Sequence, residues 1–261
     1  MSVLKSFDRP RRRAALGSIL AMGLAAAATS VVVSALPAQA VGQKVVLRAL
    51  VVTSGDPATV ALATELDREG IPYTSVSVTA PGRPTINSAF LEDAATGTAR
   101  FQAVFLPNQA GGGLAPAEVT ALSTYEAAYG IRQVNGYDYP GATMGMAAPT
   151  FAGALDGAPA TVTPAGLSGP FSYLAGSFGL DNFDPAATET YGYLAGPAAS
   201  LPAGQTFTPL LTATAGGSTG VLAGVFAHDG REELVLPEAF NQYMQWFNEV
   251  APGIVSWATR G

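Results

Sequence analysis

The chain has 261 residues and carries 13 lysine and arginine residues against 19 aspartate and glutamate residues, with a single histidine and no cysteine. This composition excludes a cysteine nucleophile, leaves His228 as the one imidazole base for a Ser-His-Asp site, and would force a zinc site to use mostly carboxylates. We therefore expect most hydrolytic and redox chemistry to be absent, and we predict neither a metal nor a cofactor.

The first forty residues have the pattern of a secretory signal peptide. Five basic residues between positions 5 and 13 precede an uncharged apolar run at 14–36, and the tripeptide Ala-Gln-Ala at 38–40 offers a small-residue cleavage site. We expect cleavage after Ala40 and a secreted or cell-surface protein. The apolar run is also long enough for an uncleaved membrane anchor, and the arginines are compatible with twin-arginine export.

Removal of this leader would leave residues 41–261 with 8 basic and 18 acidic residues, a net charge of −10. Such a surface repels nucleic acid and anionic lipid, so we expect no nucleic-acid partner and, after cleavage, no membrane partner. Without cysteine, packing rather than disulfides must stabilise the exported chain. The remaining length is sufficient for one large domain core, and we predict a single domain at 41–261.

The first part of this domain alternates between strand and helix patterns. Apolar, β-branched runs predict strands at 45–53, 73–78, 101–106 and from 131 to 134. Helices are predicted from 57 to about 69, within 86–95, and from 116 to about 129, each long one stopped by a glycine. Asp56 and Pro57 provide an N-cap and a first helical residue. This order is typical of an α/β fold with an open, mostly parallel sheet.

The second part has a different composition. Residues 147–220 are rich in glycine, alanine and proline, but their aromatic residues indicate packed structure, so we predict an irregular, β-rich insertion. Later elements are predicted as strands at 207–214, 220–227 and 232–236, a helix from 237, and a last strand at 254–257. We interpret His228 as part of a solvated hairpin turn, and Glu232 and Glu233 as a charged edge.

Polar and aromatic residues follow the predicted strands, where open α/β sheets usually bind ligands. The candidate binding residues are Asp56, Asn108, Gln109, Asn135, Tyr137, Asp138, Tyr139, Glu238 and Asn241. Amides, carboxylates and aromatic rings together suit a sugar, which needs hydrogen-bond partners for its hydroxyls and a ring face for stacking. The competing interpretation is structural, with Asp56 as a helix cap and Tyr137 and Tyr139 as covers of a core edge.

Several segments together resemble a known family. They are KVVLRALVV at the first strand, FQAVFLPNQ at the third, YEAAYGIRQVNGYDYP through the helix and fourth strand, and LVLPEAFNQYMQWFNEVAPGIVSWATRG at the end. These segments are similar to the N-terminal region of secreted polysaccharide deacetylases of the galactosaminogalactan deacetylase family. The strand pattern also resembles the flavodoxin-like domain of class I glutamine amidotransferases. The resemblance covers about 41–261 and implies a carbohydrate-binding module that precedes a metal-dependent deacetylase domain.

The chain departs from this family in its reactive residues. The family's catalytic domain begins with an Asp-Asp pair and carries later histidines, whereas this chain has no Asp-Asp pair and ends at Gly261, and the amidotransferase cysteine is missing too. The resemblance therefore implies the binding role without the activity. We expect a non-catalytic module for an extracellular or cell-wall polysaccharide, either stand-alone or truncated, that would pack against the family's missing deacetylase domain.

Two alternatives to this function stay open. One is a carboxylate-based carbohydrate hydrolase that uses a pair of acids such as Asp138 and Glu238 in one cleft. The other is a scaffold domain whose terminal helix and Trp257 pack on a downstream partner, which would require an exposed apolar patch near the end of the chain.

Overall fold

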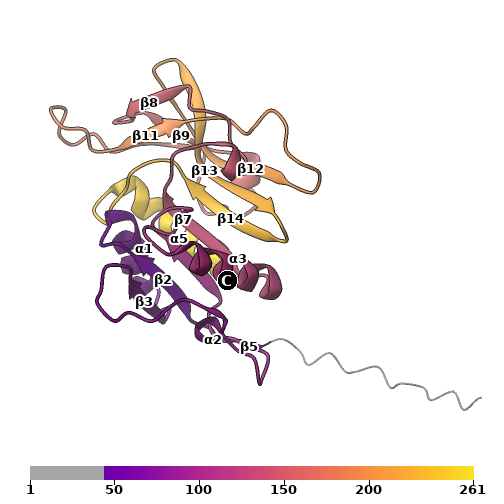
Figure 1. Ribbon diagram of the computed structural model, residues 1–261. Coiled ribbons are helices and arrows are strands. Elements are labelled where there is room, and N and C mark those ends of the chain that lie inside the picture. Colours follow the sequence, from indigo (N-terminus) through magenta and orange to yellow (C-terminus); the bar gives the residue numbers. More distant parts are fainter. Residues whose placement is uncertain (1–43) are drawn as a thin grey trace, which may run out of the picture. The chain divides into compact units, whose positions relative to one another are not determined.

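A nine-stranded sheet runs through residues 44–261, the part of the chain that the computed structural model describes (Figure 1). Its strand order is β10-β9-β12-β13-β14-β7-β6-β2-β3. The five strands from β14 to β3 are mutually parallel, and the four strands beyond β14 add to it antiparallel. The predicted α/β fold with an open sheet is confirmed, while the predicted signal peptide and its cleavage site lie outside the described residues.

The parallel half of the sheet has the order of a doubly wound fold. Its strands are β2 (Ala49–Thr53), β3 (Tyr73–Ser77), β6 (Ala103–Leu106), β7 (Arg132–Tyr137) and β14 (Arg231–Leu236). Its main helices are α1 (Pro57–Arg68), α3 (Pro116–Tyr129) and α5 (Gln245–Thr259). The chain moves outward from β2 to β3 and then crosses back to β6 on the other side of β2. The direction of winding therefore reverses between β2 and β6.

Alternation along β2 explains how this half is covered on both faces. Ala49 and Val51 belong to the core formed with α1 and α5, whereas Leu50 and Val52 belong to the core formed with α3. Successive strand side chains point to opposite faces, so a run in which all four residues are buried requires a layer of helices on each side.

The antiparallel half replaces the helix that would normally connect β7 to β14. Its elements are β8 (Phe151–Ala154), β9 (Pro159–Val162), α4 (Pro164–Leu167), β10 (Ser177–Gly179), β11 (Tyr191–Leu194), β12 (Thr206–Ala215) and β13 (Ser218–His228). The β-rich insertion is present as predicted, but β9 and β10 extend the main sheet, while β8 and β11 pair separately above it (Figure 1). The long β12–β13 hairpin turns at Gly216 and Gly217, between the strands predicted at 207–214 and 220–227.

A small three-stranded sheet includes the first strand of the described chain. It consists of β1 (Lys44–Val45), β5 (Thr98–Ala99) and β4 (Glu92–Asp93). Two short helices complete the structure: α2 (Ser88–Leu91), directly before β4, and η1 (Ala142–Met144), after β7. The strand predicted at 45–53 is thus divided between two sheets, and the helix predicted within 86–95 is reduced to α2. No helix within residues 44–261 has the length and hydropathy that a membrane span needs.

The end of the chain differs from the prediction. Residues 237–239 do not begin a helix, because they pair with β11 through Tyr193 N–H to Pro237 O and Ala239 N–H to Tyr191 O. The prediction of a strand at 254–257 was wrong, since these residues belong to α5 and continue its buried apolar face. Trp257 is 8% exposed and lies under the Arg132 guanidinium at 4.7 Å, so it packs within its own domain rather than offering the exposed patch of the scaffold alternative.

Candidate functional site

A crevice of about 290 Å³ lies beyond the carboxyl ends of β2 and β6, where the direction of winding reverses. This is the position at which open α/β sheets bind ligands. Its polar lining comes from Ser54, Asp56, Asn108, Tyr137, Glu189 and Asn241. Four of these residues were predicted from the sequence, and Glu189, from the loop that precedes β11, was not. No lysine, arginine or histidine of residues 44–261 lines the crevice.

Asp56 is both the cap of α1 and part of the crevice wall. Its Oδ1 accepts from the Thr59 N–H at 2.9 Å, and its Oδ2 accepts from the hydroxyls of Ser54 at 3.0 Å and Thr59 at 2.7 Å. Burial alone would raise the pKa of Asp56, but the hydrogen bonds from Thr59 and Ser54 outweigh it and lower the pKa. The two interpretations made from the sequence are therefore compatible, and the crevice contains a fixed negative charge.

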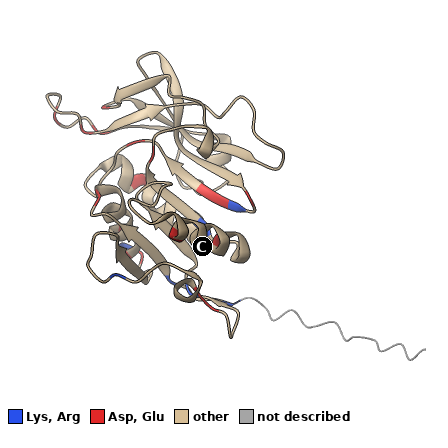
Figure 2. Ribbon diagram, in the orientation of Figure 1, with Lys and Arg blue, Asp and Glu red and all other residues tan. Residues whose placement is uncertain are grey.

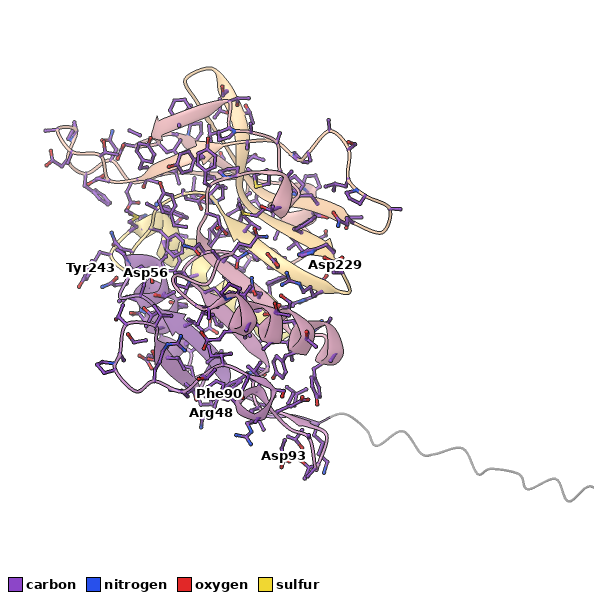
Figure 3. All side chains as sticks on the ribbon, viewed as in Figure 1. Arg48, Asp56, Phe90, Asp93, Asp229 and Tyr243 are labelled. Carbon is purple, nitrogen blue, oxygen red and sulfur yellow. The ribbon has the colours of Figure 1, made fainter. Side chains whose placement is uncertain are left out.

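Two asparagines at the crevice have amide N–H groups that donate to no residue of the described chain. Asn108 Oδ1 accepts from the Gly112 N–H at 3.1 Å, and Asn241 Oδ1 accepts from the Tyr243 N–H at 2.9 Å. Neither Nδ2 group donates to another residue within 44–261, so both N–H groups are free to bind a ligand. Tyr243 is 83% exposed, and Figure 3 shows it on the same side of the domain as Asp56.

Four tyrosine rings, which we call the tyrosine ledge, continue from the crevice. Tyr137 stacks on Tyr193 with ring centroids 5.9 Å apart, and Tyr193 contacts Tyr139 at 4.8 Å and Tyr191 at 5.7 Å, both edge to face. Tyr137 also lines the crevice, so the two features are contiguous. Burial, followed by the neighbouring Tyr193, raises the pKa of Tyr137, which keeps its hydroxyl protonated.

Tyr191 and Tyr193 were not predicted as site residues. They lie two apart on β11 and therefore share one face, while Gly192 between them faces the opposite way. A Cβ atom on Gly192 would come within 2.9 Å of the Glu238 Cβ, so glycine allows β11 to approach the end of β14 closely. The Tyr-Gly-Tyr spacing was the available signal, but the contact with residues 237–239 was not visible in the sequence.

The two acids of the hydrolase alternative are buried outside the crevice lining. Glu238 is completely buried, and both carboxylate oxygens lack a hydrogen-bond partner among residues 44–261, so burial raises its pKa well above the ordinary value. Asp138 is 5% exposed; its Oδ1 accepts from the Gln109 N–H at 3.0 Å, and its Oδ2 has no partner in the same part of the chain. Burial, with a smaller contribution from the nearby Glu233, raises the pKa of Asp138 to about 7.

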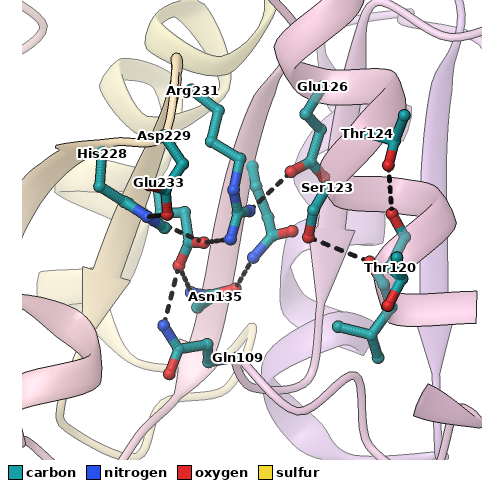
Figure 4. Close-up of polar contacts among 12 residues, drawn as sticks. Gln109, Thr120, Ser123, Thr124, Glu126, Asn135, His228, Asp229, Arg231 and Glu233 are labelled. Carbon is teal, nitrogen blue, oxygen red and sulfur yellow. Dashed lines mark hydrogen bonds and ion pairs between the residues drawn. The ribbon is translucent and has the colours of Figure 1, made fainter. Parts of the chain in front are cut away.

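Gln109 and Asn135 belong to a buried ionic cluster rather than to the crevice (Figure 4). Asn135 Nδ2 donates to Glu233 Oε2 at 2.9 Å, and Gln109 Nε2 lies 3.4 Å from the same oxygen. His228 Nε2 is 3.0 Å and Arg231 Nη2 is 2.6 Å from Glu233 Oε1. The cluster combines side chains from β7, β13, β14 and the loop after β6, which explains why the sequence did not reveal it.

This cluster corrects two interpretations made from the sequence. His228 is 7% exposed and Glu233 is fully buried, so neither a solvated turn residue nor a charged edge describes them. Burial opposes the charged form of His228, but the hydrogen bonds to Glu233 and Asp229 dominate and raise its pKa. Figure 2 shows the adjoining basic and acidic residues at the start of β14.

The charges of this cluster lie against a second cavity. This cavity has a volume of about 520 Å³, and Gln109, His228 and Arg231 are among its lining residues. Within residues 44–261, no group of three histidine, cysteine, aspartate or glutamate side chains is placed to hold a metal ion. The residues present therefore do not fit the metal of the deacetylase domain to which the sequence resemblance points.

Of the comparisons with known proteins, one with a solved structure supports the fold. No protein-family model matches the chain, and no curated protein matches it in sequence. The fold is similar to part of the crystal structure of Agd3, a carbohydrate deacetylase, with a TM-score of 0.63 and 19% identity over 83% of this chain and 33% of that chain. A GMP synthase component from Thermoplasma acidophilum gives a TM-score of 0.44 and 13% identity over 81% of this chain and 95% of that one.

The similarity to Agd3 extends to the arrangement of the chain and no further. The chain spans about a third of the length of that deacetylase. At this level of identity the comparison shows a shared fold, as the resemblance inferred from the sequence implies. It assigns no role to any residue.

Proposed function

We propose that this chain is an exported, non-catalytic module that binds a polysaccharide in the crevice beyond β2 and β6. The observation that carries the proposal is the crevice lining, where two amide N–H groups without acceptors in the described chain, a tyrosine ring and two carboxylates meet at the reversal point of the sheet. This combination matches the hydroxyls and ring face of a sugar. The shared fold with part of a carbohydrate deacetylase supports the same class of ligand.

The charges of the crevice restrict the polysaccharide. Asp56 and Glu189 contribute carboxylates, and no cationic side chain of the described residues lines the crevice. Because like charges repel in a partly desolvated site, uronic-acid or phosphate polymers should bind poorly. Neutral polymers, and the amino-sugar polymers to which the sequence resemblance points, remain compatible with this lining.

A binding role accounts for the acids better than a hydrolytic role. Glycosidases place two carboxyl groups on either side of the scissile bond, about 5–10 Å apart, with one of them ionised. Asp138 and Glu238 have raised pKa values and do not line the crevice. The two carboxylates that do line it are already hydrogen-bonded: Asp56 caps α1, and Glu189 Oε1 accepts from the Asp184 N–H at 3.1 Å.

The test is a binding panel of chitin, chitosan, cellulose, xylan and galactan with the intact chain and three variants. Asn108→Ala and Asn241→Ala should each weaken binding about 10-fold, because each removes one hydrogen bond to the ligand. Asn182→Ala, at an exposed asparagine that does not line the crevice, is the matched control. The proposal fails if no polysaccharide binds, or if all three variants behave alike. Release of reducing ends would instead favour the hydrolase.

A further inference from the structure

The tyrosine ledge is an unusual piece of surface that crevice binding does not explain. Tyr139 is 64% exposed and Tyr191 is 40% exposed, although their rings contact the same central ring, Tyr193. Large aromatic side chains that cluster at the surface generally mark a contact with another molecule. These rings come from two segments far apart in sequence, the end of β7 and β11, so the cluster is assembled by the fold.

The rings of the ledge adjoin the crevice through Tyr137. Tyr137 lines the crevice, its ring stacks on Tyr193 at 5.9 Å, and Tyr191 follows at 5.7 Å. Centroid spacings of this size are on the scale of one sugar residue. The ledge is therefore placed to receive the units that follow a sugar bound in the crevice.

The ledge is not flat. The rings of Tyr191 and Tyr139 are inclined by 81° and 67° to the ring of Tyr193. A planar crystalline polysaccharide surface would need coplanar rings to touch all of them at once. A single chain that twists between its sugar units fits inclined rings, because each unit can stack on one ring or lie against its edge.

The firm support beneath the ledge favours a preformed site. β11 is held to β8 by four pairs of residues and to residues 237–239 by the close approach at Gly192. Glu238 lies at this contact with no hydrogen-bond partner for its carboxyl within the described chain, and burial raises its pKa. Ordering these side chains should therefore cost little when a ligand binds.

We propose that the tyrosine ledge is a second carbohydrate subsite, which stacks the sugar units next to the one in the crevice and selects single polymer chains over monosaccharides and crystalline surfaces. This inference rests on the proposed function, and it adds the length and physical state of the ligand. It predicts that affinity increases with oligosaccharide length until the ledge is filled.

The experiment measures affinity by calorimetry for oligomers of one to six units, prepared from whichever panel polysaccharide binds. Tyr191→Ala should weaken binding of the hexamer about 10-fold and leave monosaccharide binding unchanged. Tyr191→Phe, which keeps the ring, should retain hexamer affinity. Tyr139→Ala provides a second truncation at a more exposed ring, and Phe183→Ala, 71% exposed on the same insertion, is the matched control.

The outcomes separate this inference from the proposed function. Equal affinity for one and six units, or an equal loss at all lengths in Tyr191→Ala, would overturn the ledge subsite while leaving the crevice proposal intact. Preference for the crystalline over the soluble form of the same polymer would overturn it as well. Asn108→Ala should weaken binding at every length, and a complete lack of binding at all lengths would reject both proposals.

Discussion

Replacement of Asp138 by asparagine should stabilise the protein above neutral pH. The asparagine keeps an oxygen for the Gln109 N–H and replaces the Oδ2 atom that has no partner within residues 44–261. The folded carboxyl holds its proton up to about pH 7, whereas the unfolded one loses it near pH 3.8. The native protein therefore loses stability as pH rises between these values, and the variant does not share this loss.

The size of the effect follows from the same pKa values. Each pKa unit corresponds to about 1.36 kcal/mol, so a shift from 3.8 to about 7 sets an upper limit of about 4 kcal/mol. Relaxation around the ionised group should reduce this limit, and we expect about 2 kcal/mol. Because other titrating groups are common to both proteins, the difference between them isolates Asp138.

The assay is urea denaturation of both proteins at pH 4 and pH 8. The two free energies of unfolding should agree at pH 4, and the variant should exceed the native protein by about 2 kcal/mol at pH 8. Asp67→Asn, at an exposed carboxyl on α1, should show no such gain and serves as the control. This prediction would be refuted if the variant were less stable than the native protein at pH 8, or if the difference in stability did not change with pH. Either result would show that interactions other than those described here stabilise the ionised Asp138 carboxylate.

Three further predictions concern other parts of the fold. Glu118→Gln breaks the paired hydrogen bonds from Arg83 at 2.6 and 2.7 Å and should cost about 2 kcal/mol at pH 7 in urea denaturation; because the pKa of Glu118 is lowered to about 2, this cost should fade as pH drops from 4.5 towards 2. Gly192→Ala should lower stability by about 1–3 kcal/mol in thermal unfolding, since its Cβ would collide with neighbouring side chains, whereas Gly196→Ala, with no atom within 4 Å, should be neutral. Asp56→Ala should cost about 1 kcal/mol, or about 3 °C in Tm by calorimetry, through loss of the α1 cap, and an unchanged Tm would contradict that role.

Local patterns predicted the parallel half of the fold well, because each element there is specified by its own residues. Asp56 and Pro57 start α1, Gly130 in the left-handed conformation ends α3, and a continuous run of apolar residues specifies the buried strand β2. The same logic placed Asp56, Asn108, Tyr137 and Asn241 at strand ends, since the carboxyl ends of parallel strands meet at one edge.

The remaining features depend on contacts that a local pattern does not contain. The N-terminus of α5 is capped by Asp181, whose carboxylate oxygens accept from the N–H groups of Gln245 at 2.7 Å and Trp246 at 3.1 Å. Without this partner in view, Pro237 was the nearest plausible start for the helix. In the same way, Glu233 is buried because His228 and Arg231 neutralise it, and a sequence with the pattern of a charged turn gives no sign of this burial.

The β-rich insertion between β7 and β14 also has a consequence for the order of folding. Glu232 of β14 pairs in register with Arg132 of β7, so their contact closes a loop of about a hundred residues. Strands β2, β3 and β6 pair over much shorter separations. Because non-local contacts form slowly, one wall of the crevice, with Asp56 and Asn108, should assemble before the opposite wall, which depends on the insertion and on residues 237–241. The crevice would then be completed only after the insertion and residues 237–241 have folded, and a ligand bound between its two walls would stabilise their contact.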